Sequence, residues 1–191
     1  RALLVGAMEY VPPDQVESVL DQSIVHPWTI VDQGGDKWRL CHDYSVGTNR
    51  YVSTSPFSLC DVWDVRHVIK EDSCMAKYDI RDGFWNCPVA ASSRKRLVVR
   101  HPGTGRLMWA TRLPFGFLDS PRLFCGVTEA IAQRLRLRAA GRGIHFFVFV
   151  DDFLIVGDDE ALTREGMKLL EDELSSLGIE WAPHKERGPC K

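Results

Sequence analysis

The feature that most constrains this chain is a pair of adjacent aspartates, Asp151 and Asp152, set between two apolar segments. Residues 144–150 and 153–156 have the composition of buried β-strands. Because burial of an unpaired carboxylate is so unfavourable, two of them cannot occupy the middle of such a strand. We therefore predict a tight turn at the rim of a sheet, flanked by strands that are buried on both faces. The alternative is an ordinary Asp-Asp hairpin turn without a function.

A third carboxylate, Asp79, stands at the end of another apolar segment, residues 75–80. If this strand neighbours the Asp151–Asp152 turn, three carboxylates gather at one edge of the sheet, and their mutual repulsion requires cations. Hard carboxylate oxygens suit Mg²⁺. Two such ions about 3.5–4 Å apart form the kind of site that displaces groups at phosphorus. A lone aspartate at a strand end is equally often a cap, so both interpretations stay open.

Composition indicates a globular protein. Hydrophobic residues make up 45% of the 191 residues and charged residues 26%, which excludes disordered, collagen-like and coiled-coil classes. The net charge of −2 lacks the basic excess of a general nucleic-acid binder. The longest apolar run, residues 146–150, is far too short to span a membrane. The chain begins with Arg1 rather than methionine, so we expect it to be part of a longer protein.

Two basic stretches and six cysteines complete the compositional picture. The basic stretches are typical of solvated surface when taken alone. The cysteines form no CxxC pair and have no zinc-type spacing, so we expect reduced, mostly buried thiols of an intracellular protein, in either cytoplasm or nucleus. The stretches comprise Arg94, Lys95, Arg96, Arg100, Arg106 and Arg112, then Arg134, Arg136, Arg138 and Arg142; the cysteines are Cys41, Cys60, Cys74, Cys87, Cys125 and Cys190.

The order of the predicted elements indicates the fold class. Apolar periodicity and capping residues predict helices that begin at Asp14, Ser58, Ser120 and Asp159, the last of them ending at Gly178. Strands are expected at residues 28–31, 37–42, 75–80, 96–100, 107–111, 144–150 and 153–156. Hairpins mixed with helices, rather than regular βαβ units, predict an α+β domain with an antiparallel sheet and helices packed on one face.

Five blocks of the sequence, in order, resemble the motifs of reverse transcriptases, which are RNA-directed DNA polymerases. The resemblance runs from about Val11 to Lys185 and is closest to the enzymes of LTR-type (gypsy-like) and DIRS-like retrotransposons. The blocks are KWRLCHDY at 37–44 with Asn49 (fingers), KYDIRDGF at 77–84 (motif A), LPFGFLDSP at 113–121 with Phe124 (motif B), FVDD at 149–152 (motif C) and GIEWAPHK at 178–185 (motif D).

This resemblance implies a right-hand polymerase fold with palm and fingers, the thumb being absent. The fingers would comprise approximately residues 11–57 and 90–112, and the palm approximately residues 58–89 and 113–191. The palm would hold the antiparallel sheet and the carboxylates.

The resemblance also implies roles for individual residues. Asp79 and Asp151 would hold two Mg²⁺ ions, or Mn²⁺ in their place, with Asp152 supporting them. Lys185 would approach the pyrophosphate. The nucleotide would further contact Arg39 through its triphosphate, Phe84 beneath its sugar, and the floor formed by Phe115 and Gly116; Ser120, Pro121 and Phe149 would face template and primer.

Together these features predict the core of an RNA-directed DNA polymerase, which adds deoxynucleotides to a primer 3′ end by two-metal-ion nucleotidyl transfer. Its expected partners are an RNA or DNA template with primer, deoxynucleoside triphosphates, and the missing thumb and connected domains of a parent polyprotein, with no membrane.

Two alternatives remain. The first is a catalytically weak or silent module that binds RNA or protein, because Asp32 stands where relatives often carry lysines that contact triphosphate. The second is a metal-dependent nuclease, which motif B and the fingers block disfavour because a nuclease has no use for groups that select a triphosphate and its sugar.

Overall fold

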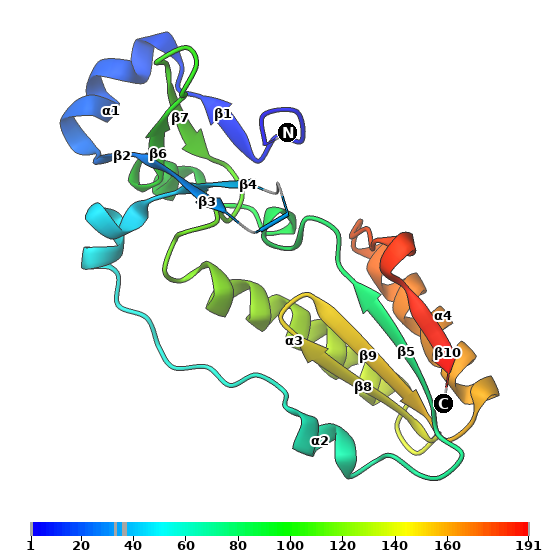
Figure 1. The fold of residues 1–191 in the computed structure, drawn as a ribbon. Helices are drawn as coiled ribbons and strands as arrows, with labels where there is room; N and C mark the ends of the chain where they lie inside the picture. Colours follow the sequence, from blue (N-terminus) through cyan, green and yellow to red (C-terminus); the bar gives the residue numbers. More distant parts are fainter. Residues whose placement is uncertain (1, 33, 36–37, 191) are drawn as a thin grey trace. The chain divides into compact units, whose positions relative to one another are not determined.

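The computed structural model describes residues 2–32, 34–35 and 38–190, apart from the side chains of residues 38–40. The chain divides into two compact units (Figure 1). The first unit comprises Arg1–Ser55 and Phe84–Pro121, and the second comprises Pro56–Gly83 and Arg122–Lys191.

The first unit contains a four-stranded sheet in the order β1-β7-β6-β2. Strand β7 (Leu107–Ala110) is antiparallel to both of its neighbours, β1 (Met8–Tyr10) and β6 (Val98–Arg100), whereas β2 (Val25–His26) runs parallel to β6. Helix α1 (Val16–Gln22) follows a 3₁₀ turn. One core cluster of this unit contains Val11, Val19, Val98 and Leu107.

A separate hairpin in the first unit is formed by β3 (Trp28–Asp32) and β4 (Trp38–His42). Two short 3₁₀ helices follow, Tyr44–Val46 and Thr48–Tyr51, and two more, Gly83–Asn86 and Ala91–Arg96, precede β6. The expected hairpin is confirmed, although part of its turn lies outside the described residues.

The second unit is built on an antiparallel sheet in the order β10-β5-β9-β8. Its strands are β10 (Arg187–Cys190), β5 (Cys74–Asp79), β9 (Asp152–Gly157) and β8 (Ile144–Phe149). Figure 1 shows the long helices α3 (Ser120–Arg138) and α4 (Glu160–Ser176) beside this sheet. Helix α4 contacts β5, β8 and β9.

A buried carboxylate joins the two long helices. Glu173 of α4 has a side chain only 3% exposed, and it is ion-paired at 3.0 Å with both Arg134 and Arg138 of α3. The other two arginines of this basic stretch also have acidic partners, Arg136 with Glu129 and Arg142 with Glu165. The second basic stretch is therefore largely neutralised within its own unit.

The long helices agree with the sequence-based expectation. Helix α3 begins at Ser120 and ends at Arg138, and α4 is capped by the Asp159 carboxylate, which accepts a hydrogen bond from the Leu162 amide at 2.8 Å. Gly178 adopts φ +68° just beyond α4, the left-handed conformation that commonly ends a helix.

The two short helices differ from expectation. The helix expected from Ser58 is instead α2 (Val62–Arg66), because the Asp61 and Asp64 side chains form a reciprocal capping box at its start. At α1, the Asp14 side chain makes no cap, and Leu20 and Ile24 are exposed rather than buried. In α2, Val62 and Trp63 are exposed as well.

Burial corrects the prediction for the strands around the aspartate pair. In β8, Ile144, Phe146 and Val148 are buried while the alternate residues are partly or fully exposed, so this strand is covered on one face only. Strands β1, β2 and β10 were not anticipated, because each is too short to show an apolar period.

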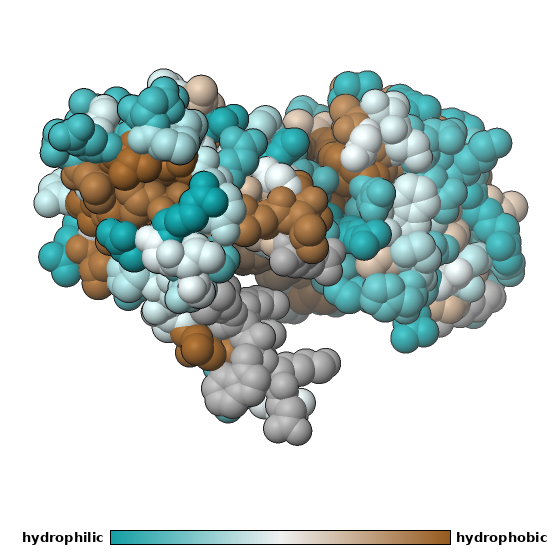
Figure 2. All heavy atoms as spheres, turned by 90° about the horizontal axis from the view of Figure 1, so that it is seen from above, coloured by the Kyte–Doolittle hydropathy of each residue, from teal (hydrophilic) through white to brown (hydrophobic). Residues whose placement is uncertain are grey.

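The surface mixes polar and apolar side chains. Figure 2 shows brown apolar patches set among teal hydrophilic groups on the face it presents.

The six cysteines are free; Cys74, Cys87 and Cys125 are buried, which is half of them rather than most. Among the described residues, no helix combines the length and apolar character needed to cross a membrane.

Candidate active site

Backbone pairing brings the three predicted carboxylates to one end of the second-unit sheet. Asp79, the last residue of β5, pairs with Asp152, the first residue of β9, and Asp152 also pairs with Phe149 of β8. The Ile80 amide donates to the Asp151 carbonyl at 2.9 Å. The expected juxtaposition of Asp79 with the aspartate pair is therefore present.

The turn that carries Asp151 has a strained backbone and is hydrogen-bonded to helix α3. Val150 has φ +59°, a left-handed conformation that is unfavourable for a β-branched residue. The hydroxyl of Thr128, a buried residue of α3, donates to the Val150 carbonyl at 3.0 Å. This contact fixes the turn against the helix, and its only sign in the sequence is a polar residue on an otherwise buried face.

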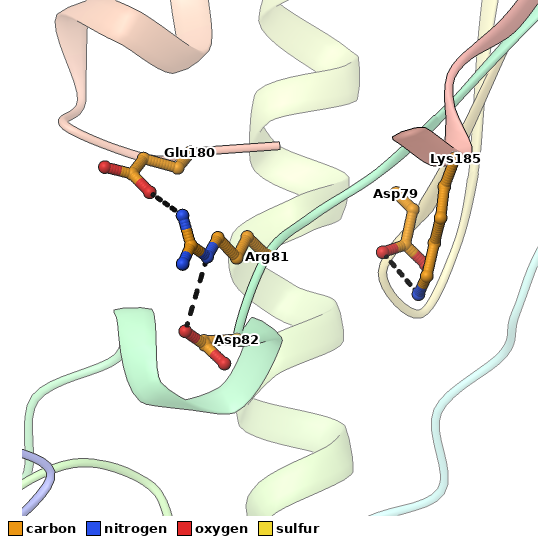
Figure 3. A network of polar contacts seen from close by, with 5 residues as sticks. All are labelled: Asp79, Arg81, Asp82, Glu180 and Lys185. Carbon is orange, nitrogen blue, oxygen red and sulfur yellow. Dashed lines mark hydrogen bonds and ion pairs between the residues drawn. The ribbon is translucent and has the colours of Figure 1, made fainter. Parts of the chain in front are cut away.

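The motif D segment is docked alongside β5 by its backbone. The Arg81 amide donates to the Glu180 carbonyl at 2.8 Å, and the Ala182 amide donates to the Asp79 carbonyl at 2.9 Å. A 3₁₀ helix, Pro183–Lys185, then turns the Lys185 side chain back, so that its Nζ lies 2.9 and 3.0 Å from the two carboxylate oxygens of Asp79 (Figure 3).

Arg81 reinforces this docking with charge. Its guanidinium lies 2.9 Å from Glu180 and 3.9 Å from Asp82. Figure 3 shows Arg81 between these two carboxylates. The motif D segment is thus tied through Glu180 to Arg81 and through Ala182 and Lys185 to Asp79. Lys185 is brought to Asp79 by this arrangement although 106 positions separate them in sequence.

The carboxylates influence one another electrostatically. Burial raises the pKa of Asp151, and the nearby charges of Asp79 and Asp152 raise that pKa further. The hydrogen bond to Asp79 raises the pKa of Lys185, so its ammonium is retained at neutral pH. The cluster is therefore rich in negative charge that cations stabilise.

Asp152 has a partner that sequence reasoning missed. The Nζ of Lys77 lies 3.0 Å from Asp152 Oδ2, whereas Asp152 Oδ1 is buried and has no hydrogen-bond partner in the described part of the chain. The signal was present in the sequence, since Lys77 stands two residues before Asp79 and strand alternation places both side chains on one face.

The three carboxylates suit a hard divalent cation, because carboxylate oxygens are the ligands that such ions prefer. One of these oxygens, Asp152 Oδ1, is buried without a hydrogen-bond partner among the described residues, and the repulsion between the carboxylates is relieved by a cation. Across the residues that the structure describes, no three His, Cys, Asp or Glu side chains are yet grouped closely enough to hold a metal ion. Asp79 is turned to Lys185 and Asp152 to Lys77 instead.

The first unit contains the predicted aromatic residues of the nucleotide site. The rings of Phe84 and Phe115 lie 5.1 Å apart, and Trp85 meets Phe115 edge-on at 6.1 Å. The structure therefore brings together two groups of predicted residues, one in each unit: the aromatic residues in the first, and the carboxylates with Lys185 in the second.

The motif B loop is locked by polar groups within the first unit. The Asn49 side chain donates to the Gly116 carbonyl and accepts from the Leu118 amide, both at 2.9 Å. Gly116 has φ +90°, and a methyl group there would collide with the His42 carbonyl of β4. The fully buried Ser120 hydroxyl donates to the Pro114 carbonyl at 2.8 Å.

The remaining predicted residues are more peripheral. Arg39 pairs with Val31 across the hairpin, but its side chain lies outside the described residues. Pro121 is half-buried in the first turn of α3, and Phe149 is 55% exposed. Asp32 accepts a hydrogen bond from the Gly34 amide at 2.8 Å and so stabilises its own turn.

Comparison with known proteins assigns the family. The family model for "Reverse transcriptase (RNA-dependent DNA polymerase)" matches residues 34–188. The chain belongs to the reverse transcriptase family. This confirms the resemblance drawn from the five sequence blocks, and reverse transcriptases as a family use divalent metal ions.

Relatives of this reverse transcriptase chain include retroviral polyproteins, which is compatible with an LTR-type origin. It is 31% identical over 190 residues to the Gag-Pro-Pol polyprotein of Mason-Pfizer monkey virus, covering 94% of this chain and 10% of the relative. It is 35% identical over 106 residues to the Gag-Pol polyprotein of koala retrovirus, covering 52% of this chain and 6% of the relative. The chain thus spans a tenth or less of these two relatives.

The fold is also found in a solved structure. The foamy viral protease-reverse transcriptase in complex with double-stranded DNA matches with a TM-score of 0.77 at 19% identity, covering 97% of this chain and 29% of that one. The α+β reverse transcriptase fold expected from the sequence is therefore confirmed.

Proposed function

We propose that this chain is the core of an RNA-directed DNA polymerase, which adds deoxynucleotides to a primer 3′ end by two-metal-ion nucleotidyl transfer. The observation that carries the proposal is the convergence of Asp79, Asp151 and Asp152 at one end of the second-unit sheet. Lys185 beside Asp79 supports it, because a cation at that point is suited to a departing polyphosphate.

In this mechanism Asp79 and Asp151 hold the two divalent ions, Mg²⁺ or Mn²⁺, and Asp152 supports them. The bound ions would supply activation of the primer hydroxyl and neutralisation of the leaving pyrophosphate. Asp151 needs the positive charge most, because burial and its two acidic neighbours disfavour its ionised form. Lys185 holds a proton on Nζ that it can donate to the pyrophosphate.

We assign the second unit to the palm and the first to the fingers together with the floor of the nucleotide site. The boundaries expected from sequence place residues 84–89 and 113–121 in the palm, whereas compactness groups them with the first unit. Phe84, packed against Phe115, would exclude a 2′-hydroxyl and so select deoxynucleotides. Gly116 lets the floor approach the backbone of β4.

Template and primer would run past Ser120, Pro121 and Phe149, and Arg39 would bind the triphosphate. The first basic stretch supplies contacts to the nucleic-acid backbone that are independent of base sequence. The thumb and connected domains of a polyprotein would complete the grip on the duplex. We place this activity inside the cell, in cytoplasm or nucleus.

Primer extension tests the proposal. Asp151→Asn should lower extension on an RNA template by about 100-fold or more, because the amide cannot replace a charged metal ligand. Asp158→Asn is the matched control: Asp151 comes directly before β9, whereas Asp158 comes directly after it, at the opposite end of the strand, where it contacts Lys70. Circular dichroism checks that both variants fold, and extension that survives in Asp151→Asn contradicts the proposal.

A second candidate is a reverse-transcriptase fold that binds RNA or protein without synthesis. Two observations favour it: Asp32 is an exposed acidic residue where a basic one would contact triphosphate, and two of the three carboxylates are already paired with lysines. Salt-sensitive RNA retention on filters with no product from any primer-template would support this alternative. Processive synthesis by the chain would exclude it.

A further inference from the structure

Lys77 occupies a defined place in the sheet that carries the carboxylates. It pairs with Leu154, and Asp79 pairs with Asp152, so Lys77 is the diagonal neighbour of Asp152 on the same face. Diagonal neighbours in an antiparallel pair are within reach of long side chains. The 3.0 Å contact between Lys77 Nζ and Asp152 Oδ2 follows from this register.

Lys77 lies beside a largely apolar groove. Lys77 and Asp152 both line a groove of about 630 Å³ in the second unit, whose other walls include Val62 of α2, Phe147 and Leu154. A lysine laid along such a surface keeps its methylenes on the apolar wall and its ammonium at the polar rim. Of the two carboxylates in this lining, Asp61 caps α2, and Asp152 is the one that the Lys77 ammonium contacts.

We propose that Lys77 is a positioning residue that holds Asp152 in the metal-free protein and acts as a built-in counter-ion of the carboxylate cluster, in competition with the divalent cation. The inference rests on the proposed function, because competition requires that the aspartates bind metal. It accounts for the orientation of Asp152, whose Oδ2 lies 3.0 Å from the Lys77 ammonium.

The two lysines at the cluster differ in how they are held. Lys185 stands on a 3₁₀ turn and contacts Asp79, whereas Lys77 lies within β5, which pairs with β9 along its whole length. Lys77 is therefore held by strand pairing on both sides, since it pairs with Leu154 of β9 and with Arg187 of β10. It withholds one Asp152 oxygen from the metal and neutralises charge beside the others.

The same strand pair provides a matched control. Lys70 forms an ion pair with Asp158 at 2.6 Å, near the end where Cys74 pairs with Gly157. Lys70 and Lys77 are similarly exposed, at 64% and 48% of their side chains. Only Lys77 adjoins the carboxylate cluster, so the two lysines separate a general loss of charge from a local one.

The experiment is a Mn²⁺ titration of the 191-residue chain followed by electron paramagnetic resonance of the free ion, with thermal unfolding in chelator alongside. Lys77→Met should tighten Mn²⁺ binding about threefold or more, because one positive charge near the metal is lost. It should also lower the metal-free unfolding midpoint. Lys77→Arg should restore both quantities, and Lys70→Met should leave Mn²⁺ affinity unchanged.

Unchanged or weaker Mn²⁺ binding in Lys77→Met, with normal binding in the unaltered chain, would overturn the inference alone. An unaltered chain that binds no Mn²⁺ would contradict the proposed function and the competition together. Thermal unfolding in chelator tests the ion pair without any metal. In the Asp152→Asn background, Lys77→Met should no longer change the unfolding midpoint. A response of equal size with and without the Asp152 carboxylate would show that Lys77 is not its counter-ion.

Discussion

The charged side chains at the carboxylate cluster of the second unit contrast with the neutral hydrogen-bond network around the buried His26 of the first unit. In the second, Asp79, Asp152 and Glu173 each face a lysine or arginine. In the first, His26 is 1% exposed and fully bonded: its Nδ1 donates to the Val98 carbonyl at 2.9 Å, and its Nε2 accepts from the Thr48 amide at 3.0 Å. Only the neutral imidazole can make both bonds.

This difference matches the tasks proposed for the two units. A cluster of like charges awaits cations, so its geometry depends on which cation is present. A network of neutral donors and acceptors instead fixes loops in a single shape, as Asn49 does for the motif B loop. We therefore expect the first unit to be sensitive to shape and acid, and the second to charge.

The largest effect on the first unit should come from Gly116→Ala. The substitution meets both an unfavourable φ of +90° and the His42 carbonyl, so we expect a loss of about 3 kcal/mol or more in the free energy of unfolding. Urea denaturation measures it. Gly105→Ala is the control, because φ there is +70° but nothing lies within 4 Å, and a loss of about 1 kcal/mol is expected. Equal losses of unfolding free energy in the two variants would show that the close approach to the His42 carbonyl contributes nothing.

The sequence predicts features that lie within a single segment better than features that depend on contacts between segments. Asp79, Asp151 and Asp152 were found because a charged residue stands out at the end of an apolar strand, and their strands are long enough to show a pattern. Helices α3 and α4 were found because their apolar residues recur over many turns. These are signals of a single segment, which a sequence displays directly.

What the sequence did not predict depends on contacts between segments. Thr128 supports the turn through the Val150 carbonyl, and His26 joins β6 to the Thr48 amide, but neither residue has a local pattern that distinguishes it. Strands β2 and β10 exist only because a partner strand is present. The helix expected from Ser58 was wrong because a capping box at Asp61 outweighed the apolar residues before it.

In the second unit, Glu173→Gln should have an intermediate effect. Removing a buried carboxylate from between Arg134 and Arg138 leaves both guanidinium groups without their partner, and we expect a loss of about 2 kcal/mol because the arginines are themselves partly exposed. Glu129→Gln is the control: its pair with Arg136 is exposed on both sides, and a change within about 0.5 kcal/mol is expected. Similar losses in both variants would show that burial of Glu173 adds nothing.

Acidification should destabilise the first unit but not the second, and this is the smallest of the predicted effects on stability. Burial lowers the pKa of His26. The pKa of His42 is lowered to about 4, mainly by burial and to a smaller extent by the charge of His26. Below pH 6.5 the unfolded chain therefore binds more protons at these two sites than the folded chain, so this stabilisation is complete above pH 6.5 and is lost as the pH falls towards 4. Asp151 has the opposite sign, because its raised pKa makes the folded second unit take up the proton first.

Between about pH 7.5 and pH 5 we expect the amides around His26 and Thr48 to lose about 1–2 kcal/mol of protection. The amides of β5 beside Asp79 should lose none. Native-state hydrogen exchange, corrected for the intrinsic rate at each pH, measures both in one sample. His145→Gln is the control, since His145 lies in β8 of the second unit and this variant should keep the difference between the units. Equal loss of protection in both units would mean that the buried histidines do not set the acid sensitivity, and that the contrast between neutral and charged networks has no thermodynamic consequence.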